Sequence, residues 1–189
     1  MNQVLECIYS RASVRSYLPD IVPEGDVREI IKAGFHAANG LNTQALRFCV
    51  VQNRDKVIQY SDLAKQLYRQ DVEMTGNSHP TLDKIANNPD FDLFYGASSV
   101  IFVFAAPEAA TPVEDGSLAI GNMMLAANSM GYGTCFIGLA AGLGYYGTFR
   151  EENKIPENVN YIGCIALGKP NGKVETHPRT EPVILSWVK

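Results

Sequence analysis

The chain has 189 residues, of which 46% are apolar and 19% are charged. This composition excludes a mainly disordered protein, and a chain of this length buries roughly 70% of the surface that its unfolded form exposes. There are 16 basic and 20 acidic side chains, which give a net charge of −4, and no block of like charge occurs. We therefore expect one globular domain over residues 1–189 that binds neither nucleic acid nor a membrane surface.

The four cysteines, Cys7, Cys49, Cys135 and Cys164, lie far apart in the sequence. No two have the spacing of zinc or iron–sulfur ligands, so we interpret them as small core residues and expect no metal site. The start of the chain, MNQVLECIYSR, lacks the apolar core of a signal peptide, and no apolar run approaches the length of a membrane span. These features predict a soluble, cytoplasmic protein with reduced thiols.

The first half of the chain predicts helices around a single strand. A helix is expected over residues 2–10, followed by a polar, basic loop over 11–19. Pro23 and the acidic residues after it predict a helix that ends near residues 39–40. We expect the elements of the next segment to be a strand over 47–52 and a helix over 55–69.

The second half predicts a central sheet. Residues 75–89 carry turn signals around at most one short helix. Residues 98–105, SSVIFVFA, are too apolar on both faces for a sheet edge. Residues 115–130 form a helix pattern that is apolar nearly all round, so the helix should be buried, either within one subunit or at a dimer seam. The remaining features are strands over 134–137 and 161–167 and an apolar tail over 183–188.

One glycine motif in this half matches the spacing of a dinucleotide-binding fingerprint. Gly142, Gly144 and Gly147 spell G-x-G-x-x-G after a predicted strand. A true fingerprint needs a helix of about three turns behind the glycines and an acid about 20 residues further on. Pro156 stops such a helix early, and residues 161–167 contain no acid. We therefore reject a Rossmann site and interpret the segment as a loop whose backbone approaches a ligand or a second subunit.

Hydrolase and metal chemistry are disfavoured by the positions of the three histidines. His36 lies in a predicted helix, His79 among turns and His177 between prolines. No Gly-x-Ser-x-Gly, His-x-x-x-His or paired-carboxylate pattern accompanies them.

Arginines and amides remain as candidates. Arg11 and Arg15 flank Ser13, and two guanidinium groups four residues apart suit a phosphate or a planar anion. The other polar candidates lie in two separate segments, Asn39, Asn42 and Gln44 in a loop and His177 and Arg179 near the end.

Four segments, in order along the chain, resemble motifs of the nitroreductase family of FMN-dependent oxidoreductases. RASVRSY at 11–17 is similar to its opening Arg-x-Ser-x-Arg/Lys motif, and NGLNTQALRF at 39–48 is similar to its Ser-x-x-Asn-x-Gln-Pro-Trp segment. GNMMLAANSMGYGTCFIG at 121–138 resembles its buried central helix and following strand. IPENVNYIGCIALGKP and then HPR, within 155–179, complete the pattern.

The resemblance implies both a fold and an activity. The fold is an α+β sandwich with a central, mostly antiparallel sheet flanked by helices, built as an intertwined homodimer with two FMN sites at the interface. The activity is that of an FMN-dependent NAD(P)H oxidoreductase. Such an enzyme takes electrons from NADH or NADPH and passes them to a nitroaromatic, a quinone or a similar small oxidised substrate by a ping-pong mechanism.

The resemblance also implies roles for the basic residues. Arg11 and Arg179 would hold the FMN phosphate, with His177 where the family often has a second basic group. Ser13 would bond the phosphate or the ribityl chain. Arg15 would lie by the pyrimidine edge of the flavin, where negative charge collects on reduction, and would raise the flavin's potential.

Further roles concern loops. Asn42 and Gln44 match the polar loop that lines the flavin, and Asn39 and Gly40 match positions that reach the FMN of the other subunit. Gly138 and Leu139 lie where relatives present backbone N–H groups to the flavin. No catalytic side chain is expected, because the flavin carries the chemistry. The expected cofactor-binding set is Arg11, Ala12, Ser13, Arg15, Asn39, Gly40, Asn42, Gln44, Gly138, Leu139, His177 and Arg179.

Some positions depart from the family pattern. Ala45-Leu46 replaces the usual Pro-Trp, Ala38-Asn39 the usual Pro-Ser, and Leu139 a common second glycine. These changes put the shape of the substrate-binding face in question, and we expect residues 70–92 to determine which substrate binds. Two alternatives stay open. One is a flavoprotein of the same fold with other chemistry, such as reductive dehalogenation, flavin fragmentation or peptide dehydrogenation, and the other is a non-catalytic FMN-binding protein.

Overall fold

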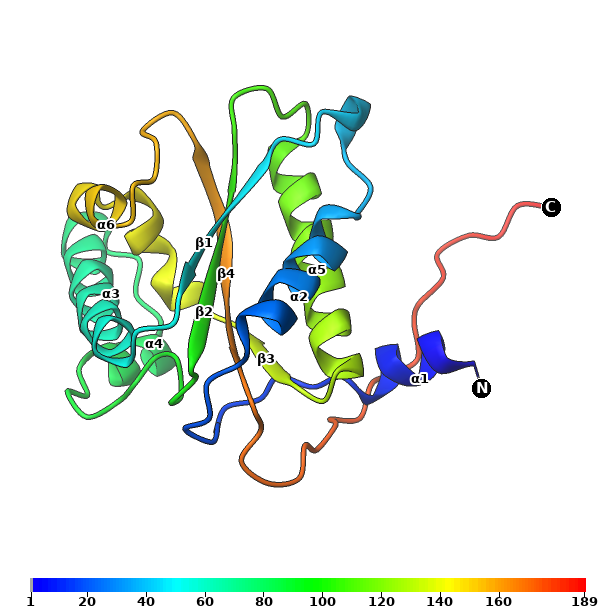
Figure 1. Ribbon diagram of the computed structural model, residues 1–189, viewed down its shortest axis with the longest axis horizontal. Helices are drawn as coiled ribbons and strands as arrows, with labels where there is room; N and C mark the ends of the chain where they lie inside the picture. The colour runs from blue at the N-terminus through cyan, green and yellow to red at the C-terminus, as the bar shows by residue number, and fades with distance from the viewer. Residues whose placement is uncertain (1) are drawn as a thin grey trace.

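The computed structural model describes residues 2–189 and contains a four-stranded antiparallel sheet between two groups of helices (Figure 1). The strands lie in the order β1 (Leu46–Val51), β2 (Ser99–Ala105), β4 (Asn160–Gly168) and β3 (Gly133–Phe136). On one side lie α3 (Arg54–Thr75), α4 (Pro80–Ala86) and α6 (Gly147–Glu152), and on the other α2 (Glu24–Phe35) and α5 (Pro112–Ser129). The remaining elements are α1 (Gln3–Ser10) and two short 3-10 helices, η1 (Gly40–Asn42) and η2 (Gly138–Tyr145). The predicted α+β sandwich is confirmed.

The inner strand β2 contributes side chains to the core on both faces of the sheet. All seven of its residues are buried. Phe102 and Phe104 pack into the cluster beneath α3 and α6, whereas Ile101 and Val103 pack into the cluster beneath α2 and α5. Alternate residues of a strand point to opposite faces, so a strand covered on both faces must be apolar throughout. The prediction from SSVIFVFA is therefore confirmed.

The first loop is fixed against the end of the sheet. The Val14 N–H donates to the Thr134 carbonyl at 2.9 Å, and the Leu18 N–H donates to the Lys169 carbonyl at 2.9 Å. A Cβ at Gly133 would lie 2.6 Å from the Val14 side chain, so glycine is needed for this close approach. These contacts hold the segment from Arg11 to Arg15 beside β3.

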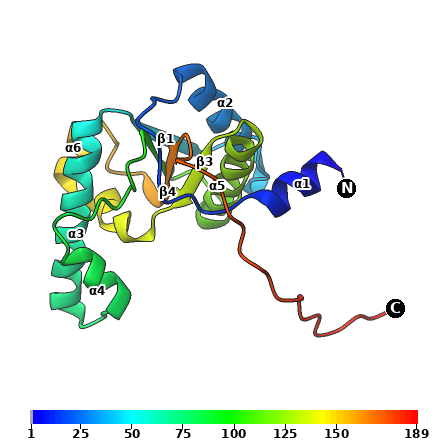
Figure 2. The same ribbon diagram turned by 90° about the horizontal axis from the view of Figure 1, so that it is seen from below.

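Both ends of the chain project from the same side of the body (Figure 2). Helix α1 has no buried residue, and the tail after Pro170 leaves the sheet without regular structure. Its apolar side chains are exposed, with Leu185 at 95% and Trp187 at 73%. Contiguous exposed apolar surface of this kind is uncommon on monomeric soluble proteins. Within residues 2–189, no helix combines the length and the apolar character needed to cross a bilayer.

Helix boundaries differ more from the predictions than strand boundaries do. Helix α2 ends at Phe35 rather than near residues 39–40, because the chain leaves the helix to bring Gly40 to the start of α5. Helix α3 continues to Thr75, and the turn-rich segment after it contains α4.

Two of the three fingerprint glycines, Gly142 and Gly144, pack closely against side chains of this chain, whereas a Cβ at Gly147 would meet nothing within 4 Å. A Cβ at Gly144 would lie 2.1 Å from the Tyr161 ring, and one at Gly142 would lie 3.0 Å from Leu67. At these two positions the close approach is therefore to the chain's own side chains. An approach of this segment to a ligand or a second subunit stays a prediction.

The cysteines divide into two groups. Cys135 and Cys164 are buried, as interpreted, whereas Cys7 and Cys49 are only half-buried. All four are free thiols. No cluster of three potential metal ligands occurs in the described part of the chain.

Candidate functional site

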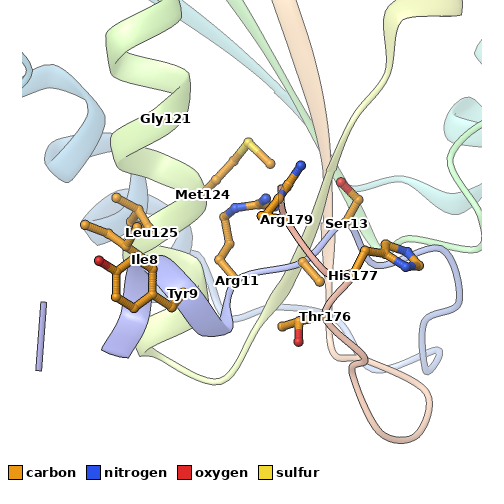
Figure 3. A pocket seen from close by; sticks show the side chains of 11 residues that line it. Ile8, Tyr9, Arg11, Ser13, Gly121, Met124, Leu125, Thr176, His177 and Arg179 are labelled. Carbon is orange, nitrogen blue, oxygen red and sulfur yellow. The ribbon is translucent and has the colours of Figure 1, made fainter. Parts of the chain in front are cut away.

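A cavity of about 660 Å³ lies where α1, the first loop, α5 and the tail meet (Figure 3). The loop contributes Arg11, Ala12 and Ser13, and the tail contributes His177 and Arg179. Five predicted cofactor-binding residues from the two ends of the sequence thus lie together. The other lining residues are Ile8, Tyr9, Gly121, Met124, Leu125 and Thr176.

The cavity is suited to an anion. Among residues 2–189, no acidic residue lines it, and the Arg11 and Arg179 side chains approach the same space (Figure 3). Nη1 of Arg11 is buried without a hydrogen-bond partner among residues 2–189. A buried, unpaired guanidinium donor is costly, and a phosphate would supply the acceptor that it lacks. The residues present therefore fit the phosphate of FMN.

Arg15 lies on the other side of Ser13. It lines a second cavity of about 290 Å³, bounded by residues 13–16 and 170–175, and Ser13 lines both cavities. Lys173 and Glu175 contribute to the second cavity. In an extended segment, residues two apart point to the same side. Arg11, Ser13 and Arg15 can therefore contact successive parts of one elongated ligand.

Cys135 is a member of this neighbourhood that the sequence did not indicate. Burial raises the pKa of its thiol, and the nearby Arg15 guanidinium and Ser13 hydroxyl oppose this shift only in part. The thiol therefore stays protonated at neutral pH, and Cys135 is part of the apolar core. A cysteine in an apolar strand carries no signal that separates it from other core residues.

The polar loop from Asn39 to Gln44 lies at the opposite end of α5. The Gly40 N–H donates to Oδ1 of Asp115 at 2.9 Å, and Asp115 is in the first turn of α5. The α5 residues that line the large cavity, Gly121, Met124 and Leu125, lie six to ten residues further along the helix, or about 9–15 Å at the rise of an α-helix. One chain therefore does not bring Asn39, Gly40, Asn42 and Gln44 to its own phosphate cavity.

Gly138 and Leu139 begin η2, which is separated from the end of β3 by one residue. A Cβ at Gly138 would meet nothing within 4 Å, and Gly138 is exposed, so its backbone is accessible. Leu139 is half-buried and packs against the core. Their contact with a flavin stays a prediction.

Ala45 and Leu46, which depart from the family pattern, lie in the core. Their exposed fractions are 2% and 7%. Because both side chains are buried, any effect of these residues on bound substrate would act through the packing of β1 and the loop before it.

Comparison with known proteins identifies the family. The nitroreductase family, as described by its sequence model, matches residues 8–169. The chain belongs to the nitroreductase family. The family inferred from RASVRSY and the three later segments is thus confirmed.

Individual relatives match over most of the chain. A crystal structure of a nitroreductase with bound FMN from Bacteroides fragilis is 26% identical, with a TM-score of 0.84 and full coverage of both chains. An Archaeoglobus fulgidus protein with the provisional name NADH dehydrogenase/NAD(P)H nitroreductase is 27% identical over 90% of this chain and 87% of its own length. The FMN reductase [NAD(P)H] of Bacillus subtilis is 25% identical over 95% of this chain and 70% of its own length.

Proposed function

We propose that residues 1–189 form one FMN-binding domain of an NAD(P)H-dependent oxidoreductase. The phosphate of FMN would bind to Arg11 and Arg179, with His177 beside them, and the rest of the cofactor would follow Ser13 toward Arg15. The observation that carries this proposal is the buried, unpaired Nη1 of Arg11, a residue that lines a cavity with no acid among its lining residues within 2–189. The family and its named relatives belong to the same class of enzyme.

The chain's residues bind and orient the cofactor rather than take part in covalent chemistry. Bound FMN would accept a hydride from NADH or NADPH and then reduce a nitroaromatic, a quinone or a similar small substrate in a ping-pong cycle. Arg15 would place a fixed positive charge at the pyrimidine edge of the ring. Backbone N–H groups of Gly138 and Leu139 would orient the ring from the strand side.

The active form would be an intertwined homodimer. The exposed apolar residues of α1 and of the tail need a covering surface, and so do the exposed side chains of Val113 and Leu118 on α5. In such a dimer, Asn39, Gly40, Asn42 and Gln44 of one subunit would complete the site whose phosphate is held by the other. This arrangement accounts for the separation of the two groups along α5.

Substrate choice would lie with residues 70–92. The end of α3 and α4 form a paired projection beside the sheet, in which the Tyr68 hydroxyl donates to Oδ1 of Asp83 at 2.9 Å (Figure 2). At its base Lys65 is buried and donates to the carbonyls of Asn88, Pro89 and Phe91 at 2.9–3.1 Å. The projection is therefore anchored at its base while its outer surface is open to substrate.

An absorbance spectrum of the purified protein tests the proposal. We expect a yellow protein, or one that becomes yellow with added FMN, and bleaching on addition of NADH or NADPH under anaerobic conditions. Reoxidation by a nitroaromatic or a quinone would complete the cycle. A colourless protein that cannot be reconstituted with FMN would exclude the proposal, and FMN binding without turnover would favour other flavin chemistry or a non-catalytic role.

A further inference from the structure

The loop from Asn39 to Gln44, here the amide loop, has an unusual backbone held by one buried carboxylate. Leu41, Asn42 and Gln44 have φ values of 53°, 55° and 51°. Residues other than glycine seldom occupy this left-handed region of the backbone. Such conformations persist where the surroundings impose them, and they cluster at functional sites. The surroundings of the amide loop must therefore hold its backbone in this conformation.

Asp115 contacts the loop from outside, and a longer hydrogen bond joins Nη1 of Arg47 to the Gln44 carbonyl at 3.4 Å. Its exposed fraction is 3%, and its Oδ1 accepts hydrogen bonds from the Gly40 N–H at 2.9 Å and from the Thr111 hydroxyl at 2.7 Å. A buried carboxylate needs such partners, so the loop and the carboxylate stabilise each other. Within the loop, the Gln44 N–H donates to Oδ1 of Asn39 at 3.0 Å and closes the turn.

The approach of the loop to α5 leaves no room for a side chain at Gly40. A Cβ there would lie 2.4 Å from Oγ1 of Thr111 and 3.1 Å from Cβ of Ala110. The need for glycine at this position thus comes from the contact with the start of α5. The loop is held on its inner side, while Leu41 at its tip is 91% exposed.

We infer that Asp115 is a positioning residue for flavin chemistry: it holds the amide loop in the conformation in which Asn42 and Gln44 meet the flavin bound by the partner subunit. This inference rests on the proposed function. Asp115 lies at the far end of α5 from the phosphate cavity, so it acts on the geometry of the ring and leaves the contacts to the phosphate unchanged. Its role is separate from that of Arg11 and Arg179.

The chain offers a matched control for the helix itself. Glu114 precedes Asp115 in the first turn of α5 and contributes a similar negative charge near the helix N-terminus, but it is exposed. A general effect of charge on α5 would therefore follow substitution of either acid. An effect through the amide loop would follow substitution of Asp115 alone.

The test compares Asp115→Ala, Asp115→Asn and Glu114→Ala in the full-length protein. In the cofactor-free dimer, hydrogen exchange of the amides in residues 40–44 should rise at least about tenfold in Asp115→Ala, because their hydrogen-bonded conformation is lost. In the FMN-loaded protein, the visible circular dichroism of the flavin should change, and flavin reduction by NAD(P)H should slow about tenfold or more. Asp115→Asn keeps an acceptor for Gly40 and should restore all three values to within about threefold, and Glu114→Ala should match the wild type.

Several outcomes would overturn the inference. The inference fails if Asp115→Ala gives the same exchange rates, flavin spectrum and reduction rate as Glu114→Ala. It also fails if Asp115→Asn does not restore the wild-type values. Either result would show that the hydrogen-bond acceptor for Gly40 does not affect the flavin. If Asp115→Ala does not fold, Gly40→Ala provides the comparison, because it displaces the loop while Asp115 remains, and an unchanged flavin spectrum in that variant contradicts the inference. A wild-type protein that binds no FMN would instead exclude the proposed function, so the two failures are distinguishable.

Discussion

The two ends of α5 are built in opposite ways. At its C-terminal end, the phosphate cavity draws residues from the first loop and the tail, and Arg11 keeps a buried donor without a partner in the described chain. At its N-terminal end, the amide loop closes on itself and on Asp115, at the cost of three unusual φ values. At one end, Arg11 and Arg179 line an open cavity, and at the other, hydrogen bonds fix the backbone of the amide loop.

This difference suggests a division of labour. The cationic end would supply most of the affinity for FMN, because bonds from guanidinium groups to phosphate are among the strong ones. The amide loop would supply geometry at the ring. Because α5 separates the two ends within one chain, a complete site would need two chains.

The largest expected effect concerns the tail that would join these chains. Burial of a large apolar side chain contributes about 1.5–3 kcal/mol. Leu185→Ser with Trp187→Ser should therefore weaken the dimer by about 10²–10⁴-fold in Kd, as measured by sedimentation at a series of concentrations. Glu181→Ser, in the same tail but outside the apolar ending, serves as the control. An unchanged Kd would show that the tail does not hold the subunits together.

The next effect concerns the phosphate end. Arg11→Ala removes a charge-assisted bond of about 1.5–3 kcal/mol, so FMN should bind about 10–100-fold more weakly in a fluorescence titration. Arg28→Ala removes a guanidinium that is exposed and paired with Glu24, and it should leave the affinity unchanged. Equal losses in the two variants would mean that Arg11 acts only through net charge.

A smaller effect on affinity is expected at Arg15. Its alanine variant should retain FMN within about tenfold of the wild type and should lower the flavin's midpoint potential, because a positive charge that favours the reduced ring is removed. Redox titration and stopped-flow reduction give the two values. If Arg15→Ala loses FMN as completely as Arg11→Ala does, the two arginines do not divide their roles.

The sequence predicted the sheet well because a strand covered on both faces must be apolar, as residues 99–105 are. It also predicted that Arg11, Ser13, His177 and Arg179 belong to one site, through the family pattern, and the structure brings them to one cavity. Asp115 could not be found in this way, because its partner Gly40 lies 75 residues away and the contact depends on tertiary folding.

The apolar helix over 115–130 illustrates a further limit of sequence patterns. It was expected to be covered on all sides, either within one subunit or at a seam. In the folded chain Leu118 is 53% exposed, although Ala119 and Met123 are fully buried. Periodicity indicates which residues avoid water, but it does not indicate whether the cover comes from the same chain.

Complementation between two defective chains tests the central claim, that each site combines the phosphate end of one subunit with the amide loop of the other. Arg11→Ala with Arg179→Ala disables the first end, and Asn42→Ala with Gln44→Ala disables the second. Each double variant alone should show little NAD(P)H oxidation. Mixed dimers should recover activity, because each contains one intact site and one doubly defective site. If both halves came from the same chain, every site in the mixed dimer would carry a defect, and the absence of any recovery would contradict the account.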